Sequence, residues 1–387
     1  MAKSATKPAS SKAPAVVTAA LGGILPAQDI RGLAEAGVIQ TTTPFGARQV
    51  QPASLDLRLG TVAYRVRASF LPQPTADVAS RLADLALHEV DLTNGAVLET
   101  GCVYVVPLLE SLALPAHIAA AANPKSSTGR LDVFTRVIAD RVPAFDTVPA
   151  GYKGQLYAEI CPQTFPVLVR TGSTLSQLRF RVGQPTITDA ELADLHRRER
   201  LVGGDAAGMV GAEPMADIQG GIALSVDLAG DSAGLVGYRA KRHTGLVDVD
   251  QPGACGLLDY WEPIHARAQR RLILDPDQFY ILASKEAVHV PPTHAAEMVP
   301  FNPLVGEFRV HYAGFMDPGF GHAPAGGTGA RVVLEVRSHK VPFVLEDGQV
   351  IGRLVYERML SVPDKLYGVD LGSNYQAQGL KLSKHFK

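Results

Sequence analysis

Residues 51–60 read QPASLDLRLG, and three leucines in this stretch, Leu55, Leu57 and Leu59, stand at every second position. Apolar residues that alternate with polar ones are typical of a strand with one buried face. Short β-rich runs continue to about residue 180, among them TVAYRVRA (61–68), GCVYVVPL (101–108) and FPVLVRTG (165–172), with Pro and Gly between them. Many short strands separated by turn residues favour a barrel or sandwich over alternating βα units. We therefore predict a mainly β fold with a few short helices.

The pattern returns in the second half of the chain. Residues 220–230, GGIALSVDLAG, repeat residues 51–60, with Asp227 at the place of Asp56. FYILASKEAVHVPP (279–292) repeats CVYVVPLLESLALP (102–115), and GARVVLEV (329–336) repeats GQLYAEI (154–160), so that Glu335 corresponds to Glu159. Matches in the same order indicate a tandem duplication of one β-rich domain. We expect a disordered tail over 1–20, a first domain over 21–185, a helical and Gly-rich linker over 186–218, and a second domain over 219–387.

Composition narrows the kinds of partner. The chain has 387 residues with 37 basic and 38 acidic side chains, which gives a net charge of −1. This balance provides no general attraction to nucleic acid or to an anionic membrane, so any anion site has to be local. No run reaches the roughly 20 apolar residues that span a bilayer. The three cysteines form no CxxC pair, which argues against a disulfide framework and a structural zinc site. We expect a cytoplasmic protein.

A cluster of hydroxyl and cationic residues lies at residues 125–130, which read Lys-Ser-Ser-Thr-Gly-Arg. Two serines, main-chain N–H groups near a glycine and the guanidinium of Arg130 can bind an anion together, because Arg grips two phosphate oxygens at once. Glu159, further along the chain, is a group that can transfer a proton beside such an anion. Taken alone, the serines are equally well explained as a turn or a helix cap.

This cluster and the acidic hairpin after it resemble the superfamily of dCTP deaminases and dUTPases. That family has a Ser-Ser-x-x-Arg phosphate motif, which corresponds here to Ser126, Ser127 and Arg130, before a β-hairpin with an acidic catalytic residue. More narrowly, the chain is similar to the long, tandem-domain form of dCTP deaminase. The resemblance implies two distorted β-barrels of the dUTPase type (β-clip domains), with sites formed between domains or between the subunits of a homo-oligomer.

The two copies differ at the phosphate motif. An alignment through His117 and His294 sets PLVGE (303–307) against residues 126–130, so a glutamate stands where Arg130 does. A carboxylate repels phosphate, and we expect no phosphate site in the second copy. The second hairpin, with an acidic turn at Asp317, is the closer match to the family, and the C-terminal tail resembles the segment that folds over the nucleotide. Asn374 in that tail stands where the family often has a lysine.

The resemblance also implies roles for single residues. In the principal interpretation Glu335 is the general base, and the first copy lends Arg130 and Ser126 to the same catalytic site. In a second interpretation Glu159 is the base. The expected substrate-binding residues are Lys125, Ser126, Ser127, Arg130, Asp146, Asp317, Val333, Leu334, Tyr367, Tyr375 and Gln378.

The zinc-deaminase signature, His or Cys with Glu two residues later and then PCxxC, is absent from the chain. We expect zinc-independent chemistry, no metal ligands from the protein, and Mg²⁺ only as a counter-ion of the triphosphate.

The implied reaction converts dCTP and water to dUTP and ammonia and supplies dUTP for thymidylate synthesis, with dTTP as an implied inhibitor. One alternative is dUTP diphosphohydrolase activity, alone or added to deamination, although the C-terminal KLSKHFK supplies no glycine-rich phosphate motif. Another is a non-catalytic nucleotide-binding regulator, for which the degenerate second phosphate motif is the best support.

Overall fold

The computed structural model describes residues 22–203, 216–300, 308–311, 314–325, 328–338, 340–368, 375–376 and 378–387. The predicted tail over 1–20, residues 204–215 of the predicted linker, residues 303–307 and Asn374 lie outside these ranges. The prediction of a mainly β chain with short helices is confirmed. In the described ranges, none of the helices has the length and apolar character that a bilayer crossing requires.

The first half of the chain consists of short strands with four helices among its described residues. Its helices are α1 (Ala27–Glu35), α2 (Val78–Leu85), α3 (Ser126–Gly129) and α4 (Asp189–Glu199). Its strands are β1 (Gly23–Ile24), β2 (Ile39–Gln40), β3 (Leu55–Arg58), β4 (Val62–Val66), β5 (Ala86–Asp91), β6 (Ala96–Leu98), β7 (Val103–Ala113), β8 (Ile118–Pro124), β9 (Val133–Ala139), β10 (Thr147–Val148), β11 (Lys153–Pro162), β12 (Val167–Val169) and β13 (Thr174–Val182).

The second half has a similar make-up. It contains the helix α5 (Leu257–Tyr260) and the 3₁₀ turn η2 (Ala323–Ala325). Its strands are β14 (Val202–Gly203), β15 (Ile222–Ser225), β16 (Leu235–Ala240), β17 (Val247–Asp248), β18 (Trp261–His265), β19 (Arg271–Leu274), β20 (Phe279–Val288), β21 (His294–Pro300), β22 (Phe308–His311), β23 (Phe315–Met316), β24 (Ala330–Ser338), β25 (Phe343–Glu346) and β26 (Val350–Arg358).

The same strand order occurs in both halves. One sheet of the first half runs β5-β4-β7-β11-β9 with β2 added on β7, and one sheet of the second half runs β18-β16-β20-β24-β22 with β14 added on β20. The smaller sheets repeat in the same way: β3, β13, β8 and β10 have the neighbours that β15, β26, β21 and β23 have. Strand β24, with Glu335, therefore holds the place in its sheet that β11, with Glu159, holds in the other.

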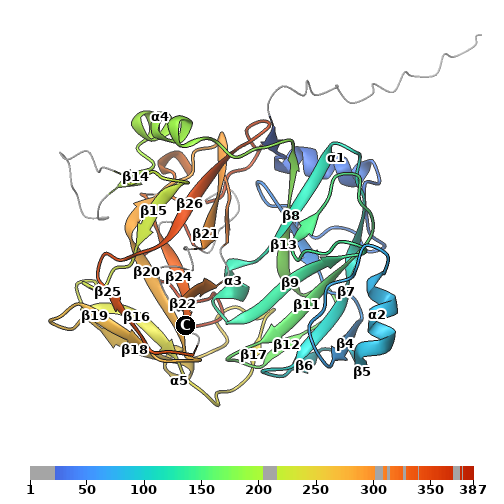
Figure 1. Ribbon diagram of the computed structural model, residues 1–387, viewed down its shortest axis with the longest axis horizontal. Coiled ribbons are helices and arrows are strands. Elements are labelled where there is room, and N and C mark those ends of the chain that lie inside the picture. Colours follow the sequence, from blue (N-terminus) through green and yellow to red (C-terminus); the bar gives the residue numbers. More distant parts are fainter. Residues whose placement is uncertain are drawn as a thin grey trace, which may run out of the picture.

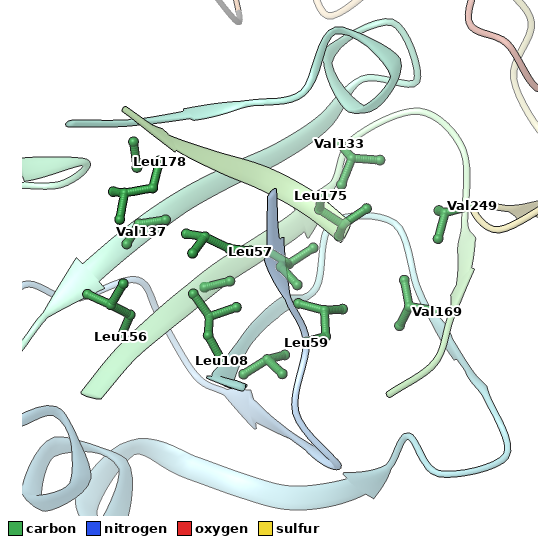
Figure 2. Packing of buried hydrophobic residues seen from close by; sticks show 14 of the residues in the cluster. Leu57, Leu59, Leu108, Val133, Val137, Leu156, Val169, Leu175, Leu178 and Val249 are labelled. Atoms are coloured by element: carbon green, nitrogen blue, oxygen red, sulfur yellow. The ribbon is translucent and has the colours of Figure 1, made fainter. Parts of the chain in front are cut away.

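Strand β3 shows how sequence and packing differ. The alternating leucines Leu55 and Leu57 lie in the hydrophobic core, as period-two spacing indicates. The pattern predicts that the opposite face is solvated, but Asp56 and Arg58 on that face are buried as well. Arg58 is paired with Glu110 at 2.7 Å, and Asp56 faces a cavity. Figure 2 shows Leu57 and its neighbours in this core, together with Val249 from the second half.

The two halves lie side by side, with α3 between them in Figure 1. They share structure along this junction. Strand β17 of the second half pairs in parallel with β12 of the first, and buried Arg179 of β13 reaches into the second half. Asp132 after α3 forms an ion pair with Arg337 of β24. The helix that carries the hydroxyl cluster is thus fixed against the strand that carries Glu335.

Candidate active site

A cavity of about 530 Å³ opens at the junction of the two halves. Both halves contribute polar and apolar side chains to its walls. From the first half these include Gln49, Asp56, Arg58, Lys125, Ser126, Ser127, Arg130, Thr174 and Gln177, and from the second Met298, Phe315, Met316, Asp317, Phe320, Val332, Val333, Glu335, Tyr367, Tyr375, Gln378 and Lys384. The cavity therefore combines most of the residues for which the sequence predicts a role in one site.

One end of the cavity is formed by helix α3 and the residue before it. Lys125 has the extended conformation that is usual for the residue that caps a helix start, and the chain then makes a single turn. Ser127 is buried, whereas Lys125 and Ser126 are half-buried and line the cavity. The ammonium group of Lys125 contacts the Asp56 carboxylate and donates to Thr174 Oγ1 at 2.9 Å. This end presents hydroxyl and ammonium donors of the kind that bind phosphate.

Arg130 is oriented by residues from the other half of the chain. Its Nη1 donates to Gln378 Oε1 at 3.1 Å and to the main-chain oxygen of Lys381 at 2.9 Å. The guanidinium lies over the Tyr375 ring, 4.0 Å from the ring centre. Its Nε has no hydrogen-bond partner among the described residues and lies 4.0 Å from Glu335 Oε1. Arg130 therefore keeps an N–H available on the side that faces the carboxyl group.

Glu335 is a buried carboxyl group in the middle of β24, with a side chain that is 5% exposed. Burial raises the pKa of Glu335 well above its ordinary value, because a carboxylate without water around it is unfavourable. The positive charge of Arg130 opposes this rise in pKa, and the negative charge of Asp132 adds to it. A carboxyl group with a raised pKa and an open position beside it is suited to accept and return a proton near neutral pH.

Asp317 lies at the same cavity and is held by a buried arginine. Arg179 Nη2 is 3.3 Å from Asp317 Oδ1, and its Nη1 is 3.0 Å from Glu357 Oε2. Burial raises the pKa of Asp317, and the charge of Arg179 works against that rise. Arg179 also lies 4.0 Å from the ring centre of Phe315, close to Asp317 in the chain. An arginine of the first half thus sets the position of an acidic residue of the second.

The C-terminal tail forms part of the cavity wall. Gln378 donates through Nε2 to the main-chain oxygen of Arg331 at 3.1 Å, and the Arg331 N–H donates back to the main-chain oxygen of Gln378 at 2.9 Å. Tyr367 packs on Phe320 with 5.7 Å between ring centres, and burial raises the pKa of its hydroxyl group. These contacts place the tail residues at the cavity, where they also meet Arg130.

Glu159 and Asp146 lie together elsewhere and are not among the residues that line the cavity. Ser69 Oγ donates to Glu159 Oε1 at 2.9 Å, and Asp146 pairs with Arg136 at 3.0 Å. Burial raises the pKa of Glu159 and raises that of Asp146 to about 6. The segment before and within α2 covers this place, since Phe70, Val78 and Leu82 belong to one apolar cluster with Tyr157 of β11.

Leu334 is also not brought to the cavity. Its side chain is fully buried in the second hydrophobic core, because successive residues of β24 point to opposite faces. Its neighbours Val333 and Glu335 face the cavity instead.

Several residues at the cavity or next to it were not predicted from the sequence, among them Asp56, Arg179 and Lys384. Asp56 is given no role at the site by the sequence, yet it lines the cavity and pairs with Lys125. Its recurrence as Asp227 is the one available signal, and it points to a repeated strand rather than to a site. Arg179 and Lys384 have no motif around them. In the part of the chain that the structure describes, no group of three or more His, Cys, Asp or Glu side chains is arranged to hold a metal ion.

Comparisons with known proteins identify the family of the chain. The model of the N-terminal domain of 2′-deoxycytidine 5′-triphosphate deaminase matches residues 21–184, and that of the C-terminal domain matches residues 188–386. A dCTP deaminase, dUMP-forming, from Corynebacterium glutamicum is 29% identical over 170 residues, which cover 43% of this chain and 84% of the relative. A dCTP deaminase from Haemophilus influenzae is 27% identical over 163 residues, 40% of this chain and 80% of the relative.

A solved structure gives the same result over a longer stretch. The crystal structure of 2′-deoxycytidine 5′-triphosphate deaminase from Agrobacterium tumefaciens is 60% identical to this chain and superposes with a TM-score of 0.82. The match covers 87% of this chain and 99% of that one. With both domain models matched in order, the chain belongs to the 2′-deoxycytidine 5′-triphosphate deaminase family.

Proposed function

We propose that this protein hydrolyses dCTP to dUTP and ammonia, with Glu335 as the general base. The observation that carries the proposal is the position of the buried Glu335 carboxyl group, 4.0 Å from Arg130 in a cavity that also holds Lys125 and Ser126. One site thus offers donors for a polyphosphate and a proton-transferring group. The family of the chain and the names of its relatives support cytosine as the reacting base.

The reaction needs two proton transfers at one place. Water adds to C4 of the cytosine ring, and loss of ammonia from the tetrahedral intermediate leaves a uracil ring. Glu335 takes one proton from the attacking water and delivers it to the ring nitrogen N3. It then carries the proton of the new C4 hydroxyl group to the departing amino group, so ammonia leaves and the carboxylate is regenerated. Its raised pKa makes it a stronger base than an exposed glutamate, which favours the first transfer.

Arg130 and Ser126 complete the chemistry in this proposal. The unpartnered Nε of Arg130 faces the carboxyl group, where an N–H donor stabilises negative charge that develops on the attacking oxygen. Ser126 presents a hydroxyl group to the same cavity and can orient the water. Because Arg130 is held by Gln378 and Tyr375, its position is set before substrate arrives.

The remaining cavity residues divide by chemistry. Lys125, Ser126 and Ser127 are placed to hold the phosphates, Asp317 to accept from a deoxyribose hydroxyl, and Val333 and Tyr367 to pack on the base. The protein supplies cations rather than carboxylates at the phosphate end, since Asp56 is already paired with Lys125. Mg²⁺ therefore enters as part of the dCTP complex, held by its phosphates. Zinc takes no part in the proposed reaction.

The family resemblance supports three finer statements about the molecule. Each half is a distorted β-barrel of the dUTPase type, an interpretation that the repeated strand order favours. The chains assemble as a homo-oligomer, and dTTP competes with dCTP for the same cavity. Sedimentation measures whether the chains form a homo-oligomer. Inhibition of ammonia release by dTTP measures the competition with dCTP.

A second candidate function is dUMP formation, in which the product dUTP is also hydrolysed to dUMP and pyrophosphate. The relatives from Corynebacterium glutamicum and Halobacterium salinarum are named dUMP-forming, which favours testing it. One experiment separates the functions. The protein is incubated with dCTP and with dUTP, with and without a chelator of zinc in the presence of Mg²⁺, and ammonia and pyrophosphate are measured.

Ammonia from dCTP that is insensitive to the zinc chelator supports deamination as proposed. Pyrophosphate from dUTP adds the second activity. Binding of dCTP without either product contradicts both and leaves a nucleotide-binding regulator.

A further inference from the structure

We propose that Lys384 of the C-terminal tail binds the terminal phosphates of the substrate and makes the site selective for a nucleoside triphosphate over a monophosphate. This inference rests on the proposed function, because it assumes a nucleotide in the cavity. Lys384 lies in the C-terminal tail, and no sequence motif identifies it as a binding residue.

Lys384 lies at the phosphate end of the cavity. Its side chain lines the cavity together with Lys125, Ser126 and Asp56. The electrostatic influence of Lys125 and Asp56 on Lys384 places the three side chains in one neighbourhood. Asn374, where the resembled family often has a lysine, lies outside the described residues. Among the described residues of the tail, Lys384 is a cation that lines the cavity.

The main chain around Lys384 is held on both sides. The N–H of Lys384 donates to the Tyr375 hydroxyl at 3.1 Å, and its carbonyl accepts from the Gly253 N–H at 3.0 Å. Ser383 Oγ donates to the main-chain oxygen of Ser127 at 2.8 Å, which joins the tail directly to α3. The buried ring of His385 lies 2.9 Å from the main-chain oxygen of Val249. A lysine fixed in this way loses little backbone entropy when it binds a ligand.

The charge of Lys384 has no close counter-ion among the described residues. Lys125 uses Asp56 as its partner, whereas no described carboxylate lies within ion-pair distance of Lys384. Burial and the neighbouring charge of Lys125 both lower the pKa of Lys384. The charges of Asp56 and Asp250 act on this pKa in the opposite direction, but Asp56 is paired with Lys125 and Asp250 with Arg170. A polyphosphate offers Lys384 an ion-pair partner through its β and γ groups, which a monophosphate lacks.

Binding constants test the inference apart from turnover. In a Glu335→Gln background, calorimetry compares dCTP with dCMP before and after the additional change Lys384→Gln. We expect the Kd for dCTP to rise about 10- to 100-fold and the Kd for dCMP to change by less than about twofold. Lys384→Arg is expected to keep most of the affinity for dCTP. Lys387→Gln, three residues later on an exposed side chain, is the matched control and is expected to bind dCTP like the parent.

An equal loss of affinity for dCTP and dCMP, or an unchanged Kd for dCTP, overturns the inference. The inference is also overturned if the unliganded Lys384→Gln protein melts at a temperature so much lower that partial unfolding explains the weaker binding of dCTP. Ammonia release by the wild-type protein tests the proposed function separately. The wild-type protein can fail to release ammonia while Lys384→Gln still weakens the binding of dCTP and not that of dCMP. That result refutes deamination but supports the polyphosphate site.

Discussion

At the scale of single residues, the main question is which glutamate transfers the proton. Glu335 and Glu159 hold equivalent places in two similar sheets, and both are buried. Only Glu335 lines the cavity with Arg130. We predict that Glu335→Gln lowers kcat for dCTP by about 10²- to 10⁴-fold, the usual range for a general base, because the amide cannot accept the proton.

Glu159→Gln is the matched control for this change. It removes the same charge from the same strand position, and we expect kcat to stay within about threefold of the wild type, which is less than 1 kcal/mol in activation free energy. Ammonia release under saturating dCTP measures both variants. A loss in Glu159→Gln as large as that in Glu335→Gln contradicts the assignment and returns Glu159 to consideration.

The raised pKa of Glu335 also predicts a dependence of stability on pH. The folded protein holds a proton on Glu335 at pH values where the unfolded chain has released it, so this group makes the folded state less stable as pH rises above about 4.5. The amide of the Glu335→Gln variant does not titrate. We predict that the free energy of unfolding of this variant, minus that of the wild type, grows between pH 4.5 and pH 8.

Urea unfolding at several pH values measures this difference. Each unit by which the pKa is raised contributes about 1.4 kcal/mol at the high-pH limit. A difference between the two proteins that is constant over this pH range contradicts the prediction, because it means that Glu335 titrates alike in the folded and unfolded states.

The sequence finds the Ser-Ser-x-x-Arg cluster but leaves both glutamates open as the base, and the reason is physical. Period two shows that Glu335 and Val333 share a face, which is correct, but it does not show what covers that face. At Glu159 the cover is Ser69 and the apolar cluster around α2, which are distant in sequence and carry no motif. Lys384 escapes notice for the same reason, since a lone lysine in a short tail matches no pattern.

At the scale of elements, the C-terminal tail is held by an aromatic cluster. Phe386 lies 5.4 Å from Tyr260, 5.7 Å from Trp261 and 6.1 Å from Phe165, measured between ring centres. The tail thereby joins α5 of the second half to β12 and its neighbours in the first. Because Ser383 and Lys384 lie just before this anchor, the cluster helps to position the part of the cavity that Lys125 and Ser126 line.

We predict that Phe386→Ala raises the KM for dCTP and makes the tail more sensitive to protease, while kcat falls less. The lost burial of a partly exposed phenylalanine costs about 1–3 kcal/mol of local stability, enough to open the tail in part without unfolding the molecule. Steady-state kinetics and limited proteolysis followed by mass spectrometry check the result. Leu258→Ala, at an exposed side chain of α5, is the control, and protease sensitivity equal in the two variants contradicts the prediction.

The repeat of strands is the element-scale feature that the sequence predicts best. Runs such as residues 102–115 and 279–292 became the equivalent strands β7 and β20, because alternation and turn residues act locally. The pairing of β17 of the second half with β12 of the first was not predicted. Val247 and Asp248 are too few to show a period, and their pairing depends on how the halves meet.

At the scale of the whole molecule, the two halves depend on each other through buried charges. Arg179 is 2% exposed and binds Asp317, Glu357 and the main-chain oxygens of Ala296 and Met316, all in the second half. Removing the arginine leaves two carboxyl groups buried without their partner. Breaking a buried ion pair on one side usually costs about 3–5 kcal/mol, and we predict a loss of that size in the free energy of unfolding of Arg179→Met at pH 7.

Arg239→Met is the control for this loss. Arg239 pairs with Glu262 at 2.7 Å, but both side chains are exposed, so its removal is expected to cost about 0–1 kcal/mol.

The prediction for Arg179→Met has a second part that depends on pH. Arg179 holds the pKa of Asp317 below the value that burial alone gives, so its removal lets Asp317 keep a proton to higher pH. The folded variant then binds more protons than the folded wild type, and the cost of Arg179→Met should shrink as pH falls from 8 to 5. Urea titrations of both variants at these two pH values measure the effect, and an equal cost at both would mean that packing of the arginine side chain, rather than its charge, joins the halves.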